Sequence, residues 1–146
     1  MTTDRIRCVV ICAFRRGDRI LVVEDYDSVK QQTFYRPLGG GIDFGEASAA
    51  AVVREIREEI GAEVVDLEYI GTVENIFTFN AVARHELIQI YDGRLVDEAL
   101  YLAQSIPGIE SNGEPIRVIW KSLDSFSTKT PLYPDGLLEL LRKREQ

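Results

Sequence analysis

Three closely spaced glutamates could together bind a divalent cation. Glu55, Glu58 and Glu59 follow a glycine-rich segment and lie in a stretch with the pattern of a helix. At about 100° per residue, Glu58 lies about 60° to one side of Glu55 and Glu59 about 40° to the other. Three carboxylates so close together repel one another, and a helix gains nothing from such a cluster. A cation that prefers oxygen ligands would reverse the sign of that interaction. We therefore expect these glutamates to bind a metal ion.

The residues around this acidic cluster resemble the Nudix box, the signature of the Nudix hydrolases. The box extends here from Gly40 to Ala62. Every glycine and polar position of the family pattern is met, by Gly40, Glu46, Arg54, Glu55, Glu58, Glu59 and Gly61. The one departure is Ala62, which is small at a packing position where the family usually has a larger apolar residue. The resemblance therefore extends to every position that could take part in chemistry.

This resemblance implies a metal-dependent hydrolysis. Nudix hydrolases cleave a nucleoside diphosphate linked to another group, X, and the difficulty is to bring water to an anion that repels it. Divalent cations lower the pKa of bound water and neutralise the diphosphate. We expect Mg²⁺, with Mn²⁺ as a substitute. By position in the box, the ligands are expected to be Glu55, Glu58, Glu59 and the backbone carbonyl of Gly39, and any of the three acids could serve as general base.

Two further box residues are expected beside the metal ligands. Arg54 resembles the family arginine that orients a neighbouring box glutamate, here Glu55, and we count it with the catalytic group. Glu46 could pair with Arg54, or it could lie in the outer shell of the metal and substrate site. A third interpretation makes Glu46 an acid in the first helical turn, where the helix dipole favours negative charge. The sequence does not choose among the three.

Many Nudix enzymes take a further metal ligand from a loop after the box. Glu114 is the first candidate for that role here, and the alternatives are Glu110, Glu98 and Glu86, the last beside His85. Each of these acids could equally be an ordinary surface residue, and a lone histidine in a turn is usually structural. We therefore treat Glu114 as an expected ligand to be tested against the structure.

Two residues outside the box are expected to bind substrate. Arg36 lies just before the glycine-rich segment, where a guanidinium could grip phosphate oxygens. The alternative for Arg36 is a structural salt bridge. Phe79 could stack on a base, although aromatic residues in strands more often belong to the core. The same choice applies to Phe77 and Tyr91.

Length and composition are typical of a small globular enzyme. The chain has 146 residues, 45% of them hydrophobic and 28% charged, and we expect a single domain over 1–146. The net charge of −7 argues against a nucleic-acid polymer, so a small nucleotide-derived molecule is the expected partner. No stretch approaches the roughly 18 apolar residues of a membrane span, and the N-terminus does not begin a secretory signal, so a cytoplasmic location is expected. Homodimers are frequent in the family, and a homodimer is a further hypothesis.

The hydrophobic pattern predicts an α+β chain that supports these residues. Strands are predicted at 7–14, 19–24, 33–36, 64–73, 74–79, 86–95 and 116–120, with loops or turns at 25–32, 37–41, 80–85 and 97–113. The box helix is predicted at 46–60, ended by Gly61, and a second helix at 136–144, capped by Asp135. The Nudix resemblance implies an α/β/α sandwich, in which a mixed sheet is flanked by the two helices.

The sequence leaves the substrate open. Motifs that mark the ADP-ribose, dinucleoside polyphosphate, NADH and coenzyme A groups of Nudix hydrolases are absent. A nucleotide sugar, an ADP-ribose-like compound and a modified nucleoside triphosphate therefore all stay candidates. The alternative to an enzyme is a non-catalytic Nudix domain that binds a nucleotide-like ligand as a regulator, although such domains often have a degraded box. A calcium site is disfavoured because the EF-hand ligand spacing is missing.

Overall fold

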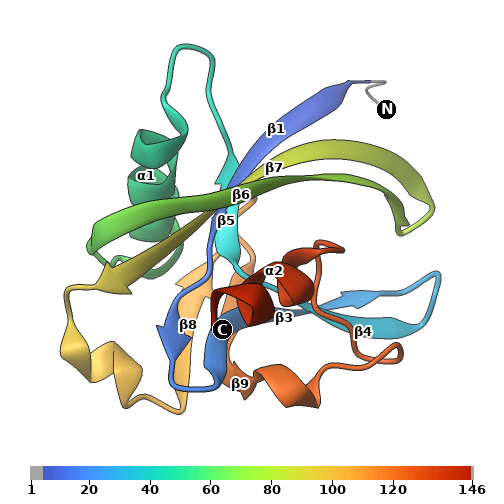
Figure 1. Ribbon diagram of the computed structural model, residues 1–146. Helices are drawn as coiled ribbons and strands as arrows, with labels where there is room; N and C mark the ends of the chain where they lie inside the picture. The colour runs from blue at the N-terminus through green and yellow to red at the C-terminus, as the bar shows by residue number, and fades with distance from the viewer. Residues whose placement is uncertain (1–4, 146) are drawn as a thin grey trace.

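The computed structural model describes residues 5–145, which form two β-sheets and two α-helices (Figure 1). The first sheet contains, in spatial order, β5 (Leu38–Gly41), β1 (Ile6–Cys12), β7 (Val82–Leu95) and β6 (Val64–Phe79). It is mixed, because β1 and β7 are parallel while its other pairs are antiparallel. The second sheet is antiparallel throughout and contains β2 (Arg15–Arg16), β3 (Arg19–Asp27), β9 (Pro115–Ser122) and β8 (Ser105–Ile109), with β4 (Gln32–Arg36) paired to β3.

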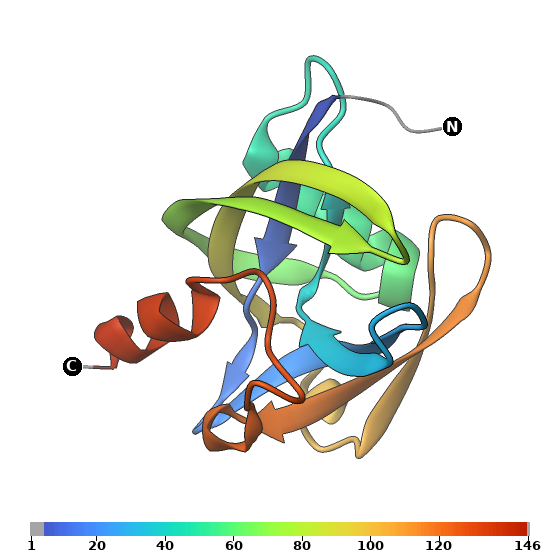
Figure 2. The same cartoon turned by 90° about the vertical axis from the view of Figure 1, so that its right-hand side faces the viewer.

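The two helices, α1 (Ser48–Ile60) and α2 (Leu137–Arg144), cover opposite faces of the strands. Neighbouring residues of one strand point to opposite faces, so β1 and β3 contribute to two separate apolar clusters. The cluster under α1 includes Val10, Leu21 and Ile56, and the cluster under α2 includes Ile11 and Leu137. Figure 2 shows α2, in red, on the other side of β1 from α1. The predicted α+β class and its layered arrangement are confirmed.

Helix α1 begins two residues later than predicted. It has Ala47 as N-cap without a side-chain cap, and it ends where predicted, at Gly61, whose φ of 66° is left-handed and whose N–H bonds to the Arg57 carbonyl. Glu46 belongs to the preceding turn, since its Oε1 accepts the Asp43 N–H at 3.1 Å. The first turn of α1 therefore contains no acidic residue. The interpretation of Glu46 as a first-turn acid was wrong.

The glycine-rich segment is a strand, whereas the sequence predicted irregular structure. Leu38–Gly41 pairs antiparallel with β1 as β5. A Cβ on Gly39 would overlap the Val10 carbonyl oxygen and lie 2.7 Å from the Ile11 Cα. Glycine is needed at this position because β5 lies so close to β1, and that close approach is compatible with regular pairing.

The predicted strands 64–73 and 74–79 form one long strand, β6, with register shifts at two places along its pairing with β7. The turn is also shorter than predicted. Only Asn80 and Ala81 separate β6 from β7, and both have positive φ, 49° and 67°. This geometry is typical of the tight hairpins that suit twisted strands. The hairpin β6–β7 is thus longer and more regular than its sequence suggested, and Figure 1 shows it curving across the molecule.

The predicted polar loop at 25–32 is a strand end followed by a turn. β3 continues to Asp27, a residue that is 2% exposed. The Asp27 carboxylate accepts the N–H groups of Val29 and Lys30 in its own turn, and of Asn80 in the β6–β7 turn. These hydrogen bonds lower the pKa of Asp27, and the bond from the Lys30 N–H has the largest effect. We call the contact of Asp27 with Asn80, together with the Ser28–Asn80 and Lys30–Thr78 hydrogen bonds, the hairpin clasp.

Two further expectations in the C-terminal half differ from the structure. The predicted loop at 97–113 contains a 3₁₀ helix, Glu98–Tyr101, and strand β8. Helix α2 follows Gly136, with φ of 92°, and has no side-chain cap, so the predicted cap by Asp135 was wrong. Among residues 5–145, no helix is long and apolar enough to cross a membrane.

Candidate active site

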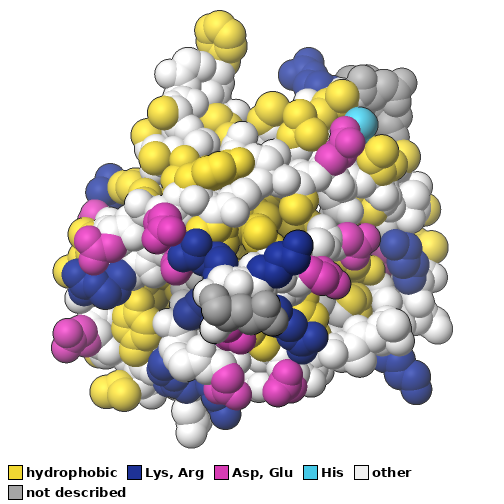
Figure 3. Space-filling model, viewed as in Figure 1, with side chains coloured by type: hydrophobic (Ala, Val, Ile, Leu, Met, Phe, Trp, Pro, Cys, Tyr) yellow, Lys and Arg dark blue, Asp and Glu magenta, His cyan; other side chains and the backbone are white. Residues whose placement is uncertain are grey.

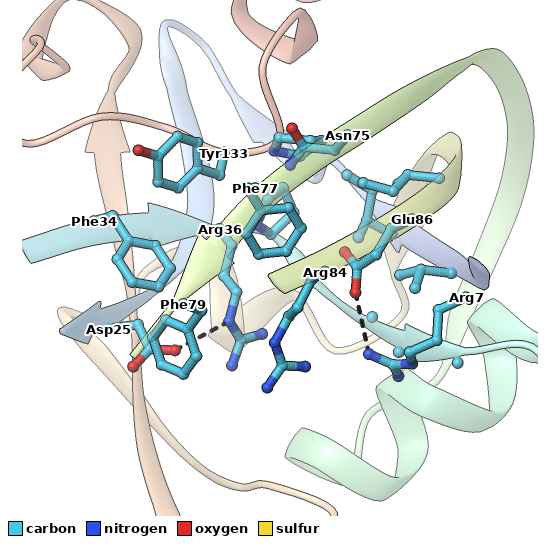
Figure 4. A pocket seen from close by; sticks show the side chains of 18 of the residues that line it. Arg7, Asp25, Phe34, Arg36, Asn75, Phe77, Phe79, Arg84, Glu86 and Tyr133 are labelled. Carbon is cyan, nitrogen blue, oxygen red and sulfur yellow. Dashed lines mark hydrogen bonds and ion pairs between the residues drawn. The ribbon is translucent and has the colours of Figure 1, made fainter. Parts of the chain in front are cut away.

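A cavity of about 950 Å³ lies where α1, the inner face of the first sheet and the β4–β5 segment meet. This size is within the usual range of small-molecule sites. Glu55 and Glu59 line one part of it, and aromatic side chains that include Phe77 and Phe79 line another. Figure 4 shows Arg36 and Arg84 pointing into the space between β6 and the β4–β5 segment. The cavity therefore combines acidic, basic and aromatic surfaces.

Glu59 is the most buried of the box acids. Its side chain comes from α1 one turn after Glu55, and the residue is 6% exposed. Its Oε1 accepts the Gly39 N–H at 2.9 Å. Burial raises the pKa of Glu59 to about 8, and the nearby carboxylates of Glu55 and Glu110 add to that rise, against the opposing effects of Arg36 and the Gly39 bond. A positive charge placed beside this carboxyl would favour its ionised form.

Gly40 allows the second cavity-lining acid, Glu55, to approach the backbone of β5. A Cβ on Gly40 would lie 2.5 Å from the Glu55 Cδ, so the Glu55 carboxylate would have to move away from its present position. The box glycine and the box glutamate fifteen positions later therefore fit each other directly.

Arg54 holds the acids of the box in place. Its guanidinium donates to both Glu46 carboxylate oxygens, at 2.8 and 2.9 Å, and to the Gly41 carbonyl at 2.9 Å. It also donates to Glu55 at 2.8 Å and to Glu58 at 3.3 Å. The hydrogen bond to Glu46 is the main cause of a raised pKa for Arg54. The contact with Glu55 is the one that the box pattern implied, and the pairing of Glu46 with Arg54 is the interpretation that the structure supports.

We expect Glu46→Gln to destabilise the protein above about pH 4.5 and to have little effect near pH 2. Arg54 lowers the pKa of Glu46 to about 2, from 4.5 for an unperturbed carboxyl. The stabilising charge pair is therefore complete above pH 4.5 and is lost as the pH falls through 2. Denaturant midpoints of wild type and variant, measured from pH 2 to 7, should converge at low pH. Glu98→Gln, at an exposed site, is the matched control, and a pH-independent difference for Glu46→Gln would contradict the prediction.

Arg36 and Phe79, the substrate-binding candidates from outside the box, both line the cavity. Arg36 is ion-paired with Asp25 and Glu110, so the salt-bridge interpretation also describes it. Phe79 contacts the Phe34 ring edge-on, with 5.7 Å between centroids. Each side chain is thus held in place within the cavity wall.

The other predicted residues do not all face the cavity. Glu58 is directed to Arg54 with a side chain 56% exposed, and neither Glu58 nor Glu46 belongs to the cavity lining. Among the later acids, Glu110 and Glu86 line the cavity, whereas Glu114 is exposed outside it. The remaining candidates outside the lining are Glu98, His85, which pairs with Glu74, and Tyr91, which bonds to Ser48.

The cavity residues have the chemistry that a divalent cation needs. Within residues 5–145, no three acidic, histidine or cysteine side chains lie close enough together in this conformation to hold a metal ion. The donor set nevertheless fits, because Glu55 and Glu59 offer hard carboxylate oxygens at one end of the cavity. The buried Glu59 carboxyl, with its raised pKa, is a group whose ionised form a cation would stabilise. Glu110 is the acid from outside the box whose position fits the same end.

Asn75 and Arg84 are among the cavity residues that the sequence interpretation missed. Both lie on the inner face of the β6–β7 hairpin, which is also the face of Phe77 and Phe79. The alternation of side chains along 73–79 was the available signal, since it places one amide among apolar residues. Arg84 could not be found in this way, because its place depends on the register between two strands.

Comparisons of the sequence and of the structure with known proteins agree on one family. A family model described as the NUDIX domain matches residues 4–136. The NAD-capped RNA hydrolase NudC of Pseudomonas aeruginosa (strain LESB58) is 40% identical over 68 residues. That match covers 47% of this chain and 24% of the relative, so the chain spans about a quarter of the length of such curated relatives.

Solved structures show the same fold. A MutT NUDIX hydrolase from Burkholderia pseudomallei is 22% identical with a TM-score of 0.61, and the match covers 94% of this chain and 98% of that one. A NUDIX hydrolase from Nitrosomonas europaea is 16% identical with a TM-score of 0.66, covering 97% and 89%. At these identities, the likeness concerns the fold alone.

Proposed function

The chain belongs to the NUDIX domain family, and on that basis we propose that it hydrolyses a diphosphate linkage in a small nucleotide-derived molecule with the help of a divalent cation, Mg²⁺ or, as a substitute, Mn²⁺. One observation carries the proposal. The acids Glu55 and Glu59 line the same cavity as the guanidinium groups of Arg36 and Arg84. Carboxylates suit a cation and guanidinium groups suit phosphate, so the two sets together fit a metal-bound diphosphate.

The reaction is a substitution at phosphorus. The oxygen of a water molecule bonds to one phosphorus, the bond from that phosphorus to the bridging oxygen breaks, and the bridging oxygen leaves with the other phosphoryl group. A divalent cation, when bound, supplies positive charge against the diphosphate and makes water easier to deprotonate. Glu55 and Glu59 would hold the cation, and Arg54 fixes the Glu55 carboxylate through its 2.8 Å hydrogen bond.

Arg84 binds a phosphate of the substrate in this proposal. The other two arginines of the cavity are occupied, Arg7 by Glu86 and Arg36 by Asp25 and Glu110. Arg84 has no ion pair among the residues described, and its Nε is buried without a hydrogen-bond partner. Its guanidinium lies over the Phe79 ring, 5.6 Å from the centroid. A phosphate oxygen would satisfy the donors that the protein leaves unused.

We expect Arg84→Met to raise KM for the diphosphate substrate about ten- to a hundredfold, with a smaller effect on kcat. The methionine keeps much of the apolar stem and removes a charge-assisted hydrogen bond of about 1.5–3 kcal/mol. Steady-state kinetics with Mg²⁺ measures both constants. Arg94→Met is the control, because Arg94 is also in β7 but pairs with the exposed Asp66 outside the cavity. An unchanged KM for Arg84→Met would show that Arg84 does not bind the substrate phosphate.

The substrate candidates are nucleotide sugars, ADP-ribose-like compounds and modified nucleoside triphosphates. The name of the Pseudomonas relative adds a further candidate of a different kind, the NAD cap of an RNA polymer. Figure 3 shows acidic and basic side chains interspersed on one face of the molecule, and the net charge is −7. The net charge favours a small molecule over a polymer, which would need a continuous basic surface. Rates on free NAD and on a short NAD-capped RNA separate the two.

A panel of such nucleotides, assayed with Mg²⁺ or Mn²⁺ for cleavage and in parallel for binding, tests the proposal. We expect release of a nucleoside monophosphate from at least one compound, and loss of the activity when EDTA is added. If one compound binds tightly and none is cleaved with either metal, the protein is a nucleotide-binding regulator and the enzymatic proposal is wrong.

A further inference from the structure

Asn75 is a buried residue whose side-chain amide has no hydrogen-bond partner within residues 5–145. Three polar side chains of the described residues are buried: Asp27, Glu59 and Asn75. Asp27 accepts three backbone N–H groups, and Glu59 accepts one. Asn75 is 7% exposed, and its side chain makes no hydrogen bond within residues 5–145. Only Arg15 Nε and Arg84 Nε are buried side-chain atoms without a partner among the described residues, so the Asn75 amide is open to the cavity that it lines, where a ligand can bond to it.

The position of Asn75 suggests what its partner is. It lines the cavity from β6, on the wall shown in Figure 4, and not the packed core between the sheets. Its direct neighbour across the hairpin is Glu86, and Phe77, two residues further along β6, faces Arg84 in the same way. A ligand whose phosphate binds Arg84 would therefore meet the Phe77 ring directly across the hairpin. The Asn75 amide lies two residues further along β6.

Glu86 makes this part of the wall rich in hydrogen-bond acceptors. One of its carboxylate oxygens, Oε2, accepts from Arg7 at 3.2 Å, which holds the side chain in place. The side chain is 13% exposed and lines the cavity. Together, Asn75 and Glu86 offer an amide carbonyl, a carboxylate and one amide NH₂ group. A partner with an NH₂ group beside an acceptor atom would match that set.

Phe77 supplies a flat surface next to these groups. The other aromatic rings of the cavity contact one another, Phe34 with both Phe79 and Tyr133. Phe77 lines the cavity and has no aromatic neighbour of that kind among the described residues. A half-buried ring that is not covered by another ring can stack on a planar ligand group.

We propose that Asn75 and Glu86 recognise the exocyclic amino group of a nucleobase that stacks on Phe77. The inference rests on the proposed function for the presence of a nucleotide, and it adds the class of base, one with an amino group such as adenine or cytosine. An asparagine amide can accept from such an amino group and donate to the neighbouring ring nitrogen. A base with a carbonyl at that position would instead place an oxygen against the Glu86 carboxylate.

Binding of matched nucleotide pairs tests the proposal. AMP and IMP differ in the group at C6 of the purine, and CMP and UMP differ at C4 of the pyrimidine. Calorimetric titrations in EDTA, without metal, should give at least one pair in which wild type binds the amino compound about tenfold more tightly, the lower part of the range for a bidentate contact. Asn75→Leu should reduce that preference, because the amide contacts are lost while the Glu86 carboxylate remains.

The controls separate recognition from folding and from catalysis. Glu74→Gln changes the adjacent residue, whose side chain pairs with His85 outside the cavity, and should keep the preference. Asn75→Asp keeps the volume and removes the donor to the ring nitrogen, so it should reduce the preference, and it tests the same contact if the leucine variant does not fold. Three results would each overturn the proposal. In the first, wild type binds the two members of each pair equally, and in the second it binds none of the four nucleotides. In the third, the folded Asn75 variants keep the wild-type preference. Base-selective binding without cleavage in the Mg²⁺ panel would overturn the enzymatic function alone, and cleavage without base preference would overturn only this inference.

Discussion

Glu59→Gln is expected to lower kcat for diphosphate hydrolysis by about a thousandfold, which corresponds to about 4 kcal/mol of transition-state stabilisation. The glutamine keeps the size of the side chain, and its carbonyl oxygen can still accept the Gly39 N–H. What it removes is the negative charge that a divalent cation requires. Glu59 and Glu55 are the two box acids that line the cavity, so the substitution removes one of the two box carboxylates available to the cation.

Initial rates with saturating Mg²⁺, on whichever compound of the panel is cleaved, measure this effect. Glu63→Gln makes the same chemical change at a side chain that is 56% exposed and paired with Arg57, and it should retain wild-type activity. Folding should be unaffected by Glu59→Gln, since burial raises the pKa of Glu59 to about 8 and the neutral amide imitates the protonated acid. A folded Glu59→Gln protein with more than about a tenth of wild-type activity would exclude Glu59 as a ligand of the cation.

Gly39→Ala is expected to destabilise the protein by about 3 kcal/mol, a fall in Tm of about 10 °C for a chain of this length. The added methyl group would overlap the Val10 carbonyl oxygen and approach the Ile11 Cα to 2.7 Å. Both are backbone atoms of β1, so no side-chain movement can relieve the contact. The strands β5 and β1 would have to separate, and the Gly39 N–H that binds Glu59 would move with them.

Thermal unfolding by circular dichroism, together with the rate on the cleaved compound, checks this result. Gly45→Ala is the matched control, because Gly45 has a positive φ of 83° but no neighbouring side chain or strand within 4 Å of the methyl group that alanine would add. It isolates the backbone cost of alanine in that conformation, about 1 kcal/mol. If Gly39→Ala and Gly45→Ala lower Tm equally, close packing of β5 on β1 is not what requires glycine at position 39.

The sequence predicted the parts of the site that depend on local spacing. Glu55 and Glu59 are one helical turn apart, so the period of α1 alone places them on one side, and Arg54 reaches Glu55 as the box pattern implied. Glu58 illustrates the limit of that reasoning. It belongs to the same arc of the helix, but the structure directs it to Arg54 and away from the cavity lining. The position of a residue around the helix axis does not determine which acidic side chains on one helix face the rest of the fold will bury.

Residues outside the box could not be placed from sequence because their positions depend on pairing between distant segments. Glu110 and Glu114 lie on the same stretch, and the β8–β9 turn puts only the first at the cavity. Asn75 and Arg84 meet there through the register of a hairpin whose turn was predicted four residues too long, at 80–85, where the structure has only Asn80 and Ala81. An error of that size in a turn changes every cross-strand neighbour.

The hairpin clasp has a consequence for how such a protein could acquire a new substrate. Asp27 and Asn80 fasten the tips of two hairpins, one from each sheet, at the end of the cavity that is remote from the acids of α1. Insertions or exchanges at these two tips would reshape the entrance without disturbing the helix that carries the acids. The residues that set substrate selectivity and those that carry out the reaction would therefore lie on separate stretches of the chain. Laboratory evolution directed at the two hairpin tips alone should change the range of compounds accepted while the chemistry is preserved.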